Sequence, residues 1–169
     1  MSKYKSLTEP ITRREACLIL ERKQFDSAVR AGRISPIGKQ GADGEVDYTA
    51  VAALTAPLLF LQEEVRTIAA DNAVQYTAES KLHAATAKAL GRTQPPLTRR
   101  QIAALFGKRL TGILIRSGRI VPDGALTDTQ TAAHTYDPIE VSSVANDLAE
   151  QYKAEAVLAA RGAKTRIPA

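Results

Sequence analysis

The sequence predicts a mostly α-helical protein in which one structural unit occurs twice, each time as two short helices, a small β-wing and a long helix. Two internal matches predict it. Residues 11–36 return without a gap as residues 97–122, 86 positions later, and eight of the 26 aligned pairs are identical. Residues 75–79 match residues 151–155 at an offset of 76. Because self-similarity at a fixed spacing indicates a repeated architecture, we expect the whole unit to be duplicated.

Each copy opens with the signature of a helix start. Thr12 is followed three residues later by Glu15, and Thr98 by Gln101. In this capping box the hydroxyl accepts a hydrogen bond from a free backbone N–H, and the carboxylate or amide reaches back to the N–H of the threonine. We therefore expect a first short helix to begin at each threonine.

A second short helix is expected to end at Gly32 in copy 1 and at Gly118 in copy 2, since a residue without Cβ suits the left-handed backbone just past a helix. Two short helices joined by a tight turn form a helix-turn-helix, whose second helix can enter the major groove of DNA. The extended Arg-Ile-x-Pro and the polar stretch after each glycine predict a two-stranded wing. Aligning Tyr48 with Tyr136, 88 positions later, places a deletion of 88 − 76 = 12 residues between the wing and the long helix of copy 2.

The amino-acid sequences of both copies resemble a known fold family. The residues that carry the resemblance are TRREA and VRAGRISP…GEVDYTAVAAL in copy 1, and LTRRQIAALFG and IRSGRIVP in copy 2. They resemble the winged helix-turn-helix of excisionases and MerR-type regulators, and the similar N-terminal DNA-binding domain of phage small terminase subunits. The resemblance covers roughly half the chain. It implies two winged helix-turn-helix units that bind duplex DNA.

The long helices carry an apolar stripe. We expect copy 1 at residues 1–48, a long helical segment at 49–92, copy 2 at 93–137 and a C-terminal helix at 138–169. Apolar residues that recur every three or four positions are typical of a helix with one buried face. A winged unit alone buries little core, so the stripe must pack on the winged units or on another subunit. A homo-oligomer is therefore one of the possible arrangements. The stripe comprises Leu54, Leu58, Leu61, Val65 and Ile68, with Val144 and Leu148 in the C-terminal helix.

Basic and polar side chains of the helix-turn-helix segments are the candidate DNA contacts. In the second helix of copy 1, Phe25, Ala28 and Val29 should be buried, which leaves the polar side chains exposed. Lysine and arginine suit phosphates, while glutamine and serine can also bond base edges. The candidates are Arg13, Arg14, Arg22, Lys23, Gln24, Ser27, Arg30, Arg33, Arg99, Arg100, Lys108, Arg109, Thr111, Arg116 and Arg119.

The two copies are expected to divide the work. Gln24 and Ser27 predict that copy 1 reads bases. The second helix of copy 2 is unusually apolar, with Leu110, Ile113 and Leu114, so copy 2 is expected to grip the DNA backbone or a protein partner. Residues 92–122 hold seven basic residues and no acidic one.

Composition favours a duplex partner. The net charge is +5 and the pI is near 9.5, which suggests a polyanionic partner. Tryptophan is absent and aromatic residues make up 5% of the chain, so few side chains could stack the bases of a single strand. One cysteine excludes an intramolecular disulfide. No run of 18 apolar residues predicts a membrane span, and we expect the protein in the cytoplasm of a bacterial host cell or in a phage particle.

Catalytic and metal-binding patterns are not found in the sequence. It lacks the phosphate-binding loop, the dinucleotide-binding loop and the nucleophile elbow. His83 and His134 have no partners at metal-ligand spacing. Cys17 stands among apolar neighbours and is expected to be a buried structural thiol. We therefore expect no cofactor, no metal and no enzymatic activity.

Two functions remain open from the sequence. The first is a duplex DNA-binding protein of phage or mobile-element type, acting in small-terminase-like DNA recognition, in excision or in transcriptional regulation, with a large terminase or recombinase as a protein partner. The second is a phage structural or assembly protein that uses the duplicated units and long helices for protein contacts. The basic helix faces favour the first, and the apolar second helix of copy 2 favours the second.

Overall fold

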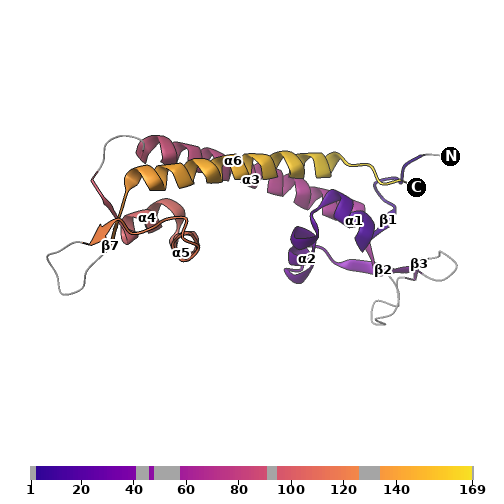
Figure 1. Ribbon diagram of the computed structural model, residues 1–169. Coiled ribbons are helices and arrows are strands. Elements are labelled where there is room, and N and C mark those ends of the chain that lie inside the picture. The colour runs from indigo at the N-terminus through magenta and orange to yellow at the C-terminus, as the bar shows by residue number, and fades with distance from the viewer. Residues whose placement is uncertain (1–2, 41–45, 48–57, 91–94, 126–133, 169) are drawn as a thin grey trace. The chain divides into compact units, whose positions relative to one another are not determined.

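The chain forms a mostly helical protein that divides into two compact units (Figure 1). Unit 1 consists of Met1–Tyr76 and Ala154–Ala169, and unit 2 of Thr77–Lys153. None of the described helices is long and apolar enough to cross a membrane. The computed structural model describes residues 3–40, 46–47, 58–90, 95–125 and 134–168.

Unit 1 combines two short helices with a four-stranded antiparallel sheet. The strand order in this sheet is β1-β4-β2-β3, and Ile11 in β1 lies opposite Phe60 in β4. The elements in chain order are β1 (Pro10–Thr12), α1 (Arg13–Ile19), α2 (Arg22–Arg30), β2 (Pro36–Gln40), β3 (Val46–Asp47), β4 (Leu58–Leu61) and the first part of α3 (Gln62–Leu90).

Unit 2 combines two short helices with a three-stranded antiparallel sheet. Its strand order is β5-β7-β6, and Leu97 in β5 lies opposite Tyr136 in β7. The elements in chain order are β5 (Leu97–Thr98), α4 (Arg99–Phe106), α5 (Lys108–Arg116), β6 (Gly124–Ala125), β7 (His134–Tyr136) and the first part of α6 (Pro138–Lys164).

Both units follow the same order of strand, two short helices, further strands and long helix. In each sheet the strand before the long helix pairs with the strand before the first short helix. Phe60 and Tyr136 therefore occupy matching places, 76 positions apart, and the predicted alignment of Tyr136 with Tyr48 is wrong. The offset changes from 86 to 76 between the short helices and this strand, so the length difference lies within the wing segment.

The predicted helix starts are confirmed. The Thr12 hydroxyl accepts from the Glu15 N–H at 3.3 Å, and the Thr12 N–H donates to Glu15 Oε2 at 2.7 Å. The corresponding distances for Thr98 and Gln101 are 3.4 and 2.7 Å. Two local hydrogen bonds thus satisfy backbone and side-chain groups at the start of each first helix.

The predicted helix ends are confirmed as well. Gly32 has φ +69° and Gly118 has φ +71°. The Gly32 N–H donates to the Val29 carbonyl at 3.0 Å, and the Arg33 N–H donates to the Ala28 carbonyl at 2.9 Å. The same two bonds follow α5, at 3.1 and 2.9 Å. This pair of bonds is the Schellman motif, which satisfies carbonyls that the helix leaves free.

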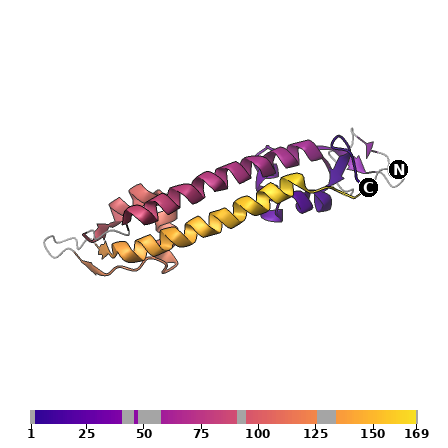
Figure 2. The same cartoon turned by 90° about the horizontal axis from the view of Figure 1, so that it is seen from above.

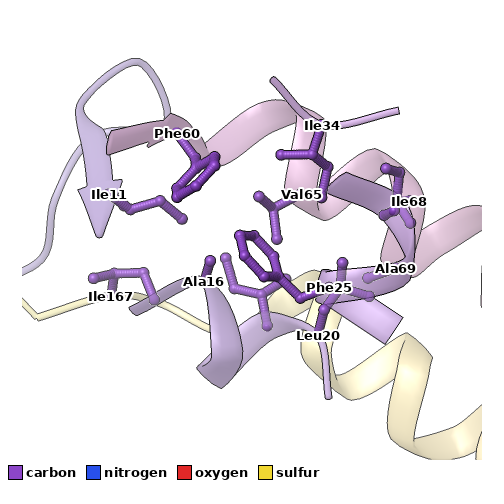
Figure 3. Close-up of a cluster of buried hydrophobic side chains, with 12 residues drawn as sticks. Ile11, Ala16, Leu20, Phe25, Ile34, Phe60, Val65, Ile68, Ala69 and Ile167 are labelled. Atoms are coloured by element: carbon purple, nitrogen blue, oxygen red, sulfur yellow. The ribbon is translucent and has the colours of Figure 1, made fainter. Parts of the chain in front are cut away.

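The core of unit 1 lies between the sheet, the short helices and the start of α3 (Figure 3). Phe25 and Phe60 meet edge to face with ring centroids 5.0 Å apart. Phe25 and Ala28 are buried as predicted, and Val29 is partly buried against the same cluster. Ile167, from the last residues of the chain, is fully buried there.

The predicted apolar stripe is wrong in its first half. Leu58 and Leu61 belong to β4, which pairs with β1 and β2, and α3 starts at Gln62 rather than at Thr49. A run of four apolar residues fits a buried strand as well as a helix, and here the sheet partners decide. Leu54 lies outside the described residues.

The second half of the stripe belongs to two separate cores. Val65 and Ile68 are buried in the core of unit 1, and Val144 and Leu148 in that of unit 2. Each core uses the helix that follows its own sheet. The structure therefore accounts for these four residues without another subunit.

Helices α3 and α6 each run without a break from one unit into the other (Figure 2). In unit 1, Arg66 Nη1 on α3 donates to the Ala163 carbonyl on α6 at 2.9 Å. In unit 2, Ser142 Oγ on α6 donates to the Ala87 carbonyl on α3 at 2.9 Å. Both the donors and the acceptors are 76 positions apart. Each unit thus closes its core with the end of the helix that begins in the other unit.

Candidate nucleic-acid interface

The outer face of α2 carries two cations that flank a serine. Lys23, Ser27 and Arg30 are exposed and are spaced four and three residues apart, which places them in one row along the helix. Arg22 is exposed beside this row. The opposite face holds the buried Phe25. This helix therefore presents basic and hydroxyl groups outward, as predicted.

The outer face of α5 repeats the pattern 86 positions later. Arg109, Ile113 and Arg116 are exposed and form the equivalent row, with Lys108 in the place of Arg22. Ile113, at 45% exposure, takes the place of the serine. The two second helices are labelled α2 and α5 in Figure 1. They share cations at three matched positions and differ at the central residue.

The first helices add a pair of exposed arginines each. Arg13 and Arg14 begin α1, and Arg99 and Arg100 begin α4, at the same offset. All four are exposed. Together with the second helices they give each unit five matched cations, without counting Arg33 or Arg119 in the turn that follows the second helix.

In unit 1 a carboxylate partly neutralises this face. Arg13 holds Asp26 through Nη2, at 2.6 and 2.8 Å from the two oxygens, and through Nε at 3.2 Å. The hydrogen bond to Asp26, with its negative charge, raises the pKa of the Arg13 guanidinium. Arg22 lies 4.0 Å from the same carboxylate, and Arg30 Nε donates to the Asp26 carbonyl at 3.2 Å. Asp26 therefore contacts three of the five cations.

Unit 2 lacks this carboxylate. The position that aligns with Asp26 is Gly112. Within the part of the chain that the structure describes, no carboxylate oxygen lies within 4.0 Å of the five cations of α4 and α5. Among the described residues, these five cations therefore have no carboxylate partner that a phosphate would have to displace.

The arginine just after each second helix pairs with the long helix of the same unit. Arg33 Nη2 lies 3.3 Å from Asp71 in unit 1, and Arg119 Nη2 lies 3.5 Å from Asp147 in unit 2. The two arginines are 86 positions apart and the two aspartates 76 positions apart, which are the two offsets of the internal repeat. The ion pair therefore occurs at equivalent positions in both units. Both arginines remain partly exposed, and these pairs hold the turn after the second helix against the long helix.

Two predicted contacts differ from expectation. Gln24 is half-buried, and its Nε2 donates to the Tyr76 hydroxyl at 3.1 Å. Thr111 is 1% exposed and donates to the Ile102 carbonyl at 3.3 Å, so its prediction as a groove-facing residue is wrong. Thr111 aligns with the core residue Phe25, and this alignment could have predicted its burial.

Most apolar residues of α5 serve the core of unit 2. Leu114 is buried, and Leu110 and Ile115 pack partly buried against the same cluster. Only Ile113 among the large apolar residues of this helix is exposed. The core of unit 2 thus explains most of the apolar residues of α5. Only Ile113 is left as a side chain that could contact a protein partner.

His83 is buried in unit 2 without a hydrogen bond to either ring nitrogen. Its ring stacks on Tyr152 at 5.4 Å and lies 5.6 Å from the Phe106 ring. Burial lowers the pKa of His83, although the Glu79 carboxylate 3.7 Å away partly opposes this. Across the described residues, no three histidine, cysteine or acidic side chains gather as metal ligands. His83 is therefore a core residue whose burial disfavours the charged form. Cys17 is a half-buried thiol beside the core of unit 1.

We expect stability to fall as pH drops below about 6.5, the usual pKa of histidine, because the unfolded chain then binds a proton that folded His83 resists. The loss continues until the pH reaches the lowered pKa of the folded state. Urea denaturation between about pH 7.5 and 5 checks this, with a His83→Leu variant expected to lose most of the dependence. His134→Gln, at an exposed position, should keep the wild-type profile. Equal pH profiles for wild type and His83→Leu would contradict the assignment.

Comparison with known proteins gives no relative for this chain: no family model, no curated protein and no solved structure matches it.

Proposed function

We propose that this chain is a non-enzymatic duplex DNA-binding protein with two winged helix-turn-helix units that arose by internal duplication. Each unit lays its second helix, α2 or α5, in the major groove. The observation that carries the proposal is the repeated outer face of these helices, where exposed cations stand at three matched positions. An α-helix fits the major groove, and lysine and arginine on its outer face reach the flanking phosphates.

Matched interactions support the duplication. The capping boxes and the C-terminal glycines recur at an offset of 86. The strand before each long helix and the hydrogen bonds from Arg66 and Ser142 recur at 76. A wing-arginine to long-helix ion pair occurs in both units. Duplication of one ancestral unit explains why such different contacts recur at these two offsets.

The division of base and backbone contacts remains part of the proposal. Ser27 is exposed in the middle of the α2 row and can bond a base edge. Gln24 can do so only if it leaves Tyr76. In unit 2 the central side chain is Ile113, which offers apolar contact and no hydrogen bond. Sequence reading is thus assigned to unit 1, and backbone contact chiefly to unit 2.

The biological setting rests on the resemblance to excisionases, MerR-type regulators and small terminase subunits. On that basis the protein acts in DNA packaging, excision or transcriptional control of a phage or mobile element. Its protein partner would be a large terminase or a recombinase. It would work in the host cytoplasm or in the phage particle.

The alternative is a structural or assembly protein that binds other proteins. One observation favours it: unit 1 has a groove of about 340 Å³ with the exposed Leu18 and Leu158 in its lining. These leucines are 56% and 64% exposed, and exposed apolar side chains gathered at a groove are typical of protein-interaction sites. Glu21, just before α2, and Gln24 within it also line this groove, whereas Lys23, Ser27 and Arg30 do not, so variants of the two leucines test the alternative without changing the basic row.

We expect binding to a random duplex of about 20 base pairs to weaken steeply with salt, because phosphate contacts release counterions. If roughly six phosphates are neutralised, log affinity plotted against log salt should have a slope near −5. Fluorescence anisotropy of a labelled duplex between about 50 and 300 mM salt measures this, with a single strand of the same sequence as the control. No duplex binding at the lowest salt, or a flat salt response, would sink the proposal. Self-association through the leucine groove without DNA binding would support the alternative.

A further inference from the structure

The two basic faces are unequal in charge although their cations match. Residues 11–36 contain six basic and three acidic residues, so their net charge is 6 − 3 = +3. Residues 97–122 contain six basic and no acidic residues, a net charge of +6. The acids Glu15, Glu21 and Asp26 align with Gln101, Gly107 and Gly112. Of these three acids, only Asp26 contacts the cations of the proposed DNA face.

Asp26 competes directly with phosphate. Arg13 Nη2 and Nε, which would form the fork that binds a phosphate, are occupied by the Asp26 carboxylate. Arg22 is drawn toward the same group. A phosphate that binds Arg13 must displace this carboxylate or accept its repulsion. Unit 1 therefore loses at least one phosphate contact relative to its number of cations.

Nothing in the local packing requires a glycine at position 112. A Cβ added there would meet only the Arg116 guanidinium, at 3.7 Å from Nη1, which is an ordinary contact. Its φ is not positive, and it lies inside α5, where glycine is a poor helix former. An aspartate at this position would stand beside Arg116 and one turn from Lys108, much as Asp26 stands beside Arg30 and Arg22.

We propose that Asp26 and Gly112 set the strength with which each unit grips the phosphate backbone, so that unit 2 is the principal phosphate-binding module and unit 1 is held to weak backbone contact. This inference rests on the proposed DNA binding and deepens it. Weak backbone contact suits a unit that reads bases, because binding then depends more on the sequence contacted. Strong contact suits a unit that holds any sequence.

The test exchanges the two side chains with neutral controls. Asp26→Asn removes the charge and keeps the shape, while Gly112→Asp and Gly112→Asn differ from one another only in charge. Asp26→Asn should tighten binding to a random duplex several-fold at about 50 mM salt and steepen the salt slope by about one. Gly112→Asp should bind about tenfold more weakly than Gly112→Asn and flatten the slope by about one. Circular dichroism of each variant shows whether the fold is retained.

Elution from heparin, run on the same variants, separates the two proposals. The expected order is Gly112→Asp first, then wild type, then Asp26→Asn at the highest salt. If the variants elute in this order but none binds duplex, the DNA-binding function is overturned. The two units would then still differ in how strongly they bind polyanions such as heparin. A second outcome would overturn only the proposed difference between the two units. In that outcome wild type binds duplex, Asp26→Asn binds as tightly as wild type, and Gly112→Asp binds as tightly as Gly112→Asn. Loss of binding in both Gly112 variants alike would also overturn it, because charge would then not be the cause.

Discussion

Replacing Gly162 with alanine is expected to destabilise unit 1 by about 3 kcal/mol or more, because the new methyl group would overlap backbone rather than a flexible side chain. Gly162 lies near the end of α6, where the helix crosses the end of α1. A Cβ built on it would overlap the Ile19 carbonyl oxygen and lie 3.1 Å from the Ile19 carbonyl carbon. Neither backbone can move away without disturbing the core residues around Ile19 and Ala163.

Urea denaturation followed by circular dichroism measures this effect, and Gly112→Ala is the matched control. Both glycines lie within helices, but a Cβ at Gly112 meets only an arginine side chain at van der Waals distance. Gly112→Ala should therefore leave stability unchanged or raise it by up to about 1 kcal/mol, the difference in helix propensity. A Gly162→Ala protein as stable as wild type would mean that α6 does not close the core of unit 1 at this place.

The helix ends were predictable because their signals are local. The capping boxes lie within four residues, and each C-terminal glycine acts on the turn just before it. The buried side of α2 followed from spacing alone. These features depend on neighbours a few positions away, which the sequence shows directly.

The strand at Leu58–Leu61 was missed because its structure depends on distant partners. The run is apolar on both faces and continues the three-and-four spacing of α3, so the pattern alone favoured a helix. Pairing with Ile11, about fifty residues earlier, makes it a strand. Aligning Phe60 with Tyr136, 76 positions later, could have shown this, since Tyr136 ends a strand two residues before the helix that starts at Pro138.

The neutralisation of one basic face could not be read from the sequence. Asp26 and Arg13 lie on different helices and meet only when α1 and α2 pack. The burial of His83 is similar, because Phe106 and Tyr152 come from α4 and α6. The tertiary structure was also needed to show that each unit closes its core with the end of the helix that begins in the other unit. Local patterns thus predicted the short helices and most of their exposed basic residues, while the strand at Leu58–Leu61 and the charge balance of the candidate interface depended on tertiary contacts.

The central claim, that the second helices hold duplex DNA, is tested most directly by neutralising one of them. We expect replacement of Lys108, Arg109 and Arg116 by glutamine to weaken binding to a random duplex about a hundredfold or more at about 50 mM salt. The salt slope should become flatter by about 2.7, or about 0.9 for each lost phosphate contact. These side chains are exposed and lie outside the core, so the fold should be retained.

The matched control removes the same charge from the long helices, through glutamine at the exposed Lys81, Lys88 and Lys153. Anisotropy titrations of wild type and both triple variants across the same salt series form the measurement. The account predicts a large loss of affinity with a flatter slope for the α5 variant, and affinity close to wild type for the control. Equal losses in the two variants would attribute binding to net charge alone and contradict the account, and so would an α5 variant that binds like wild type.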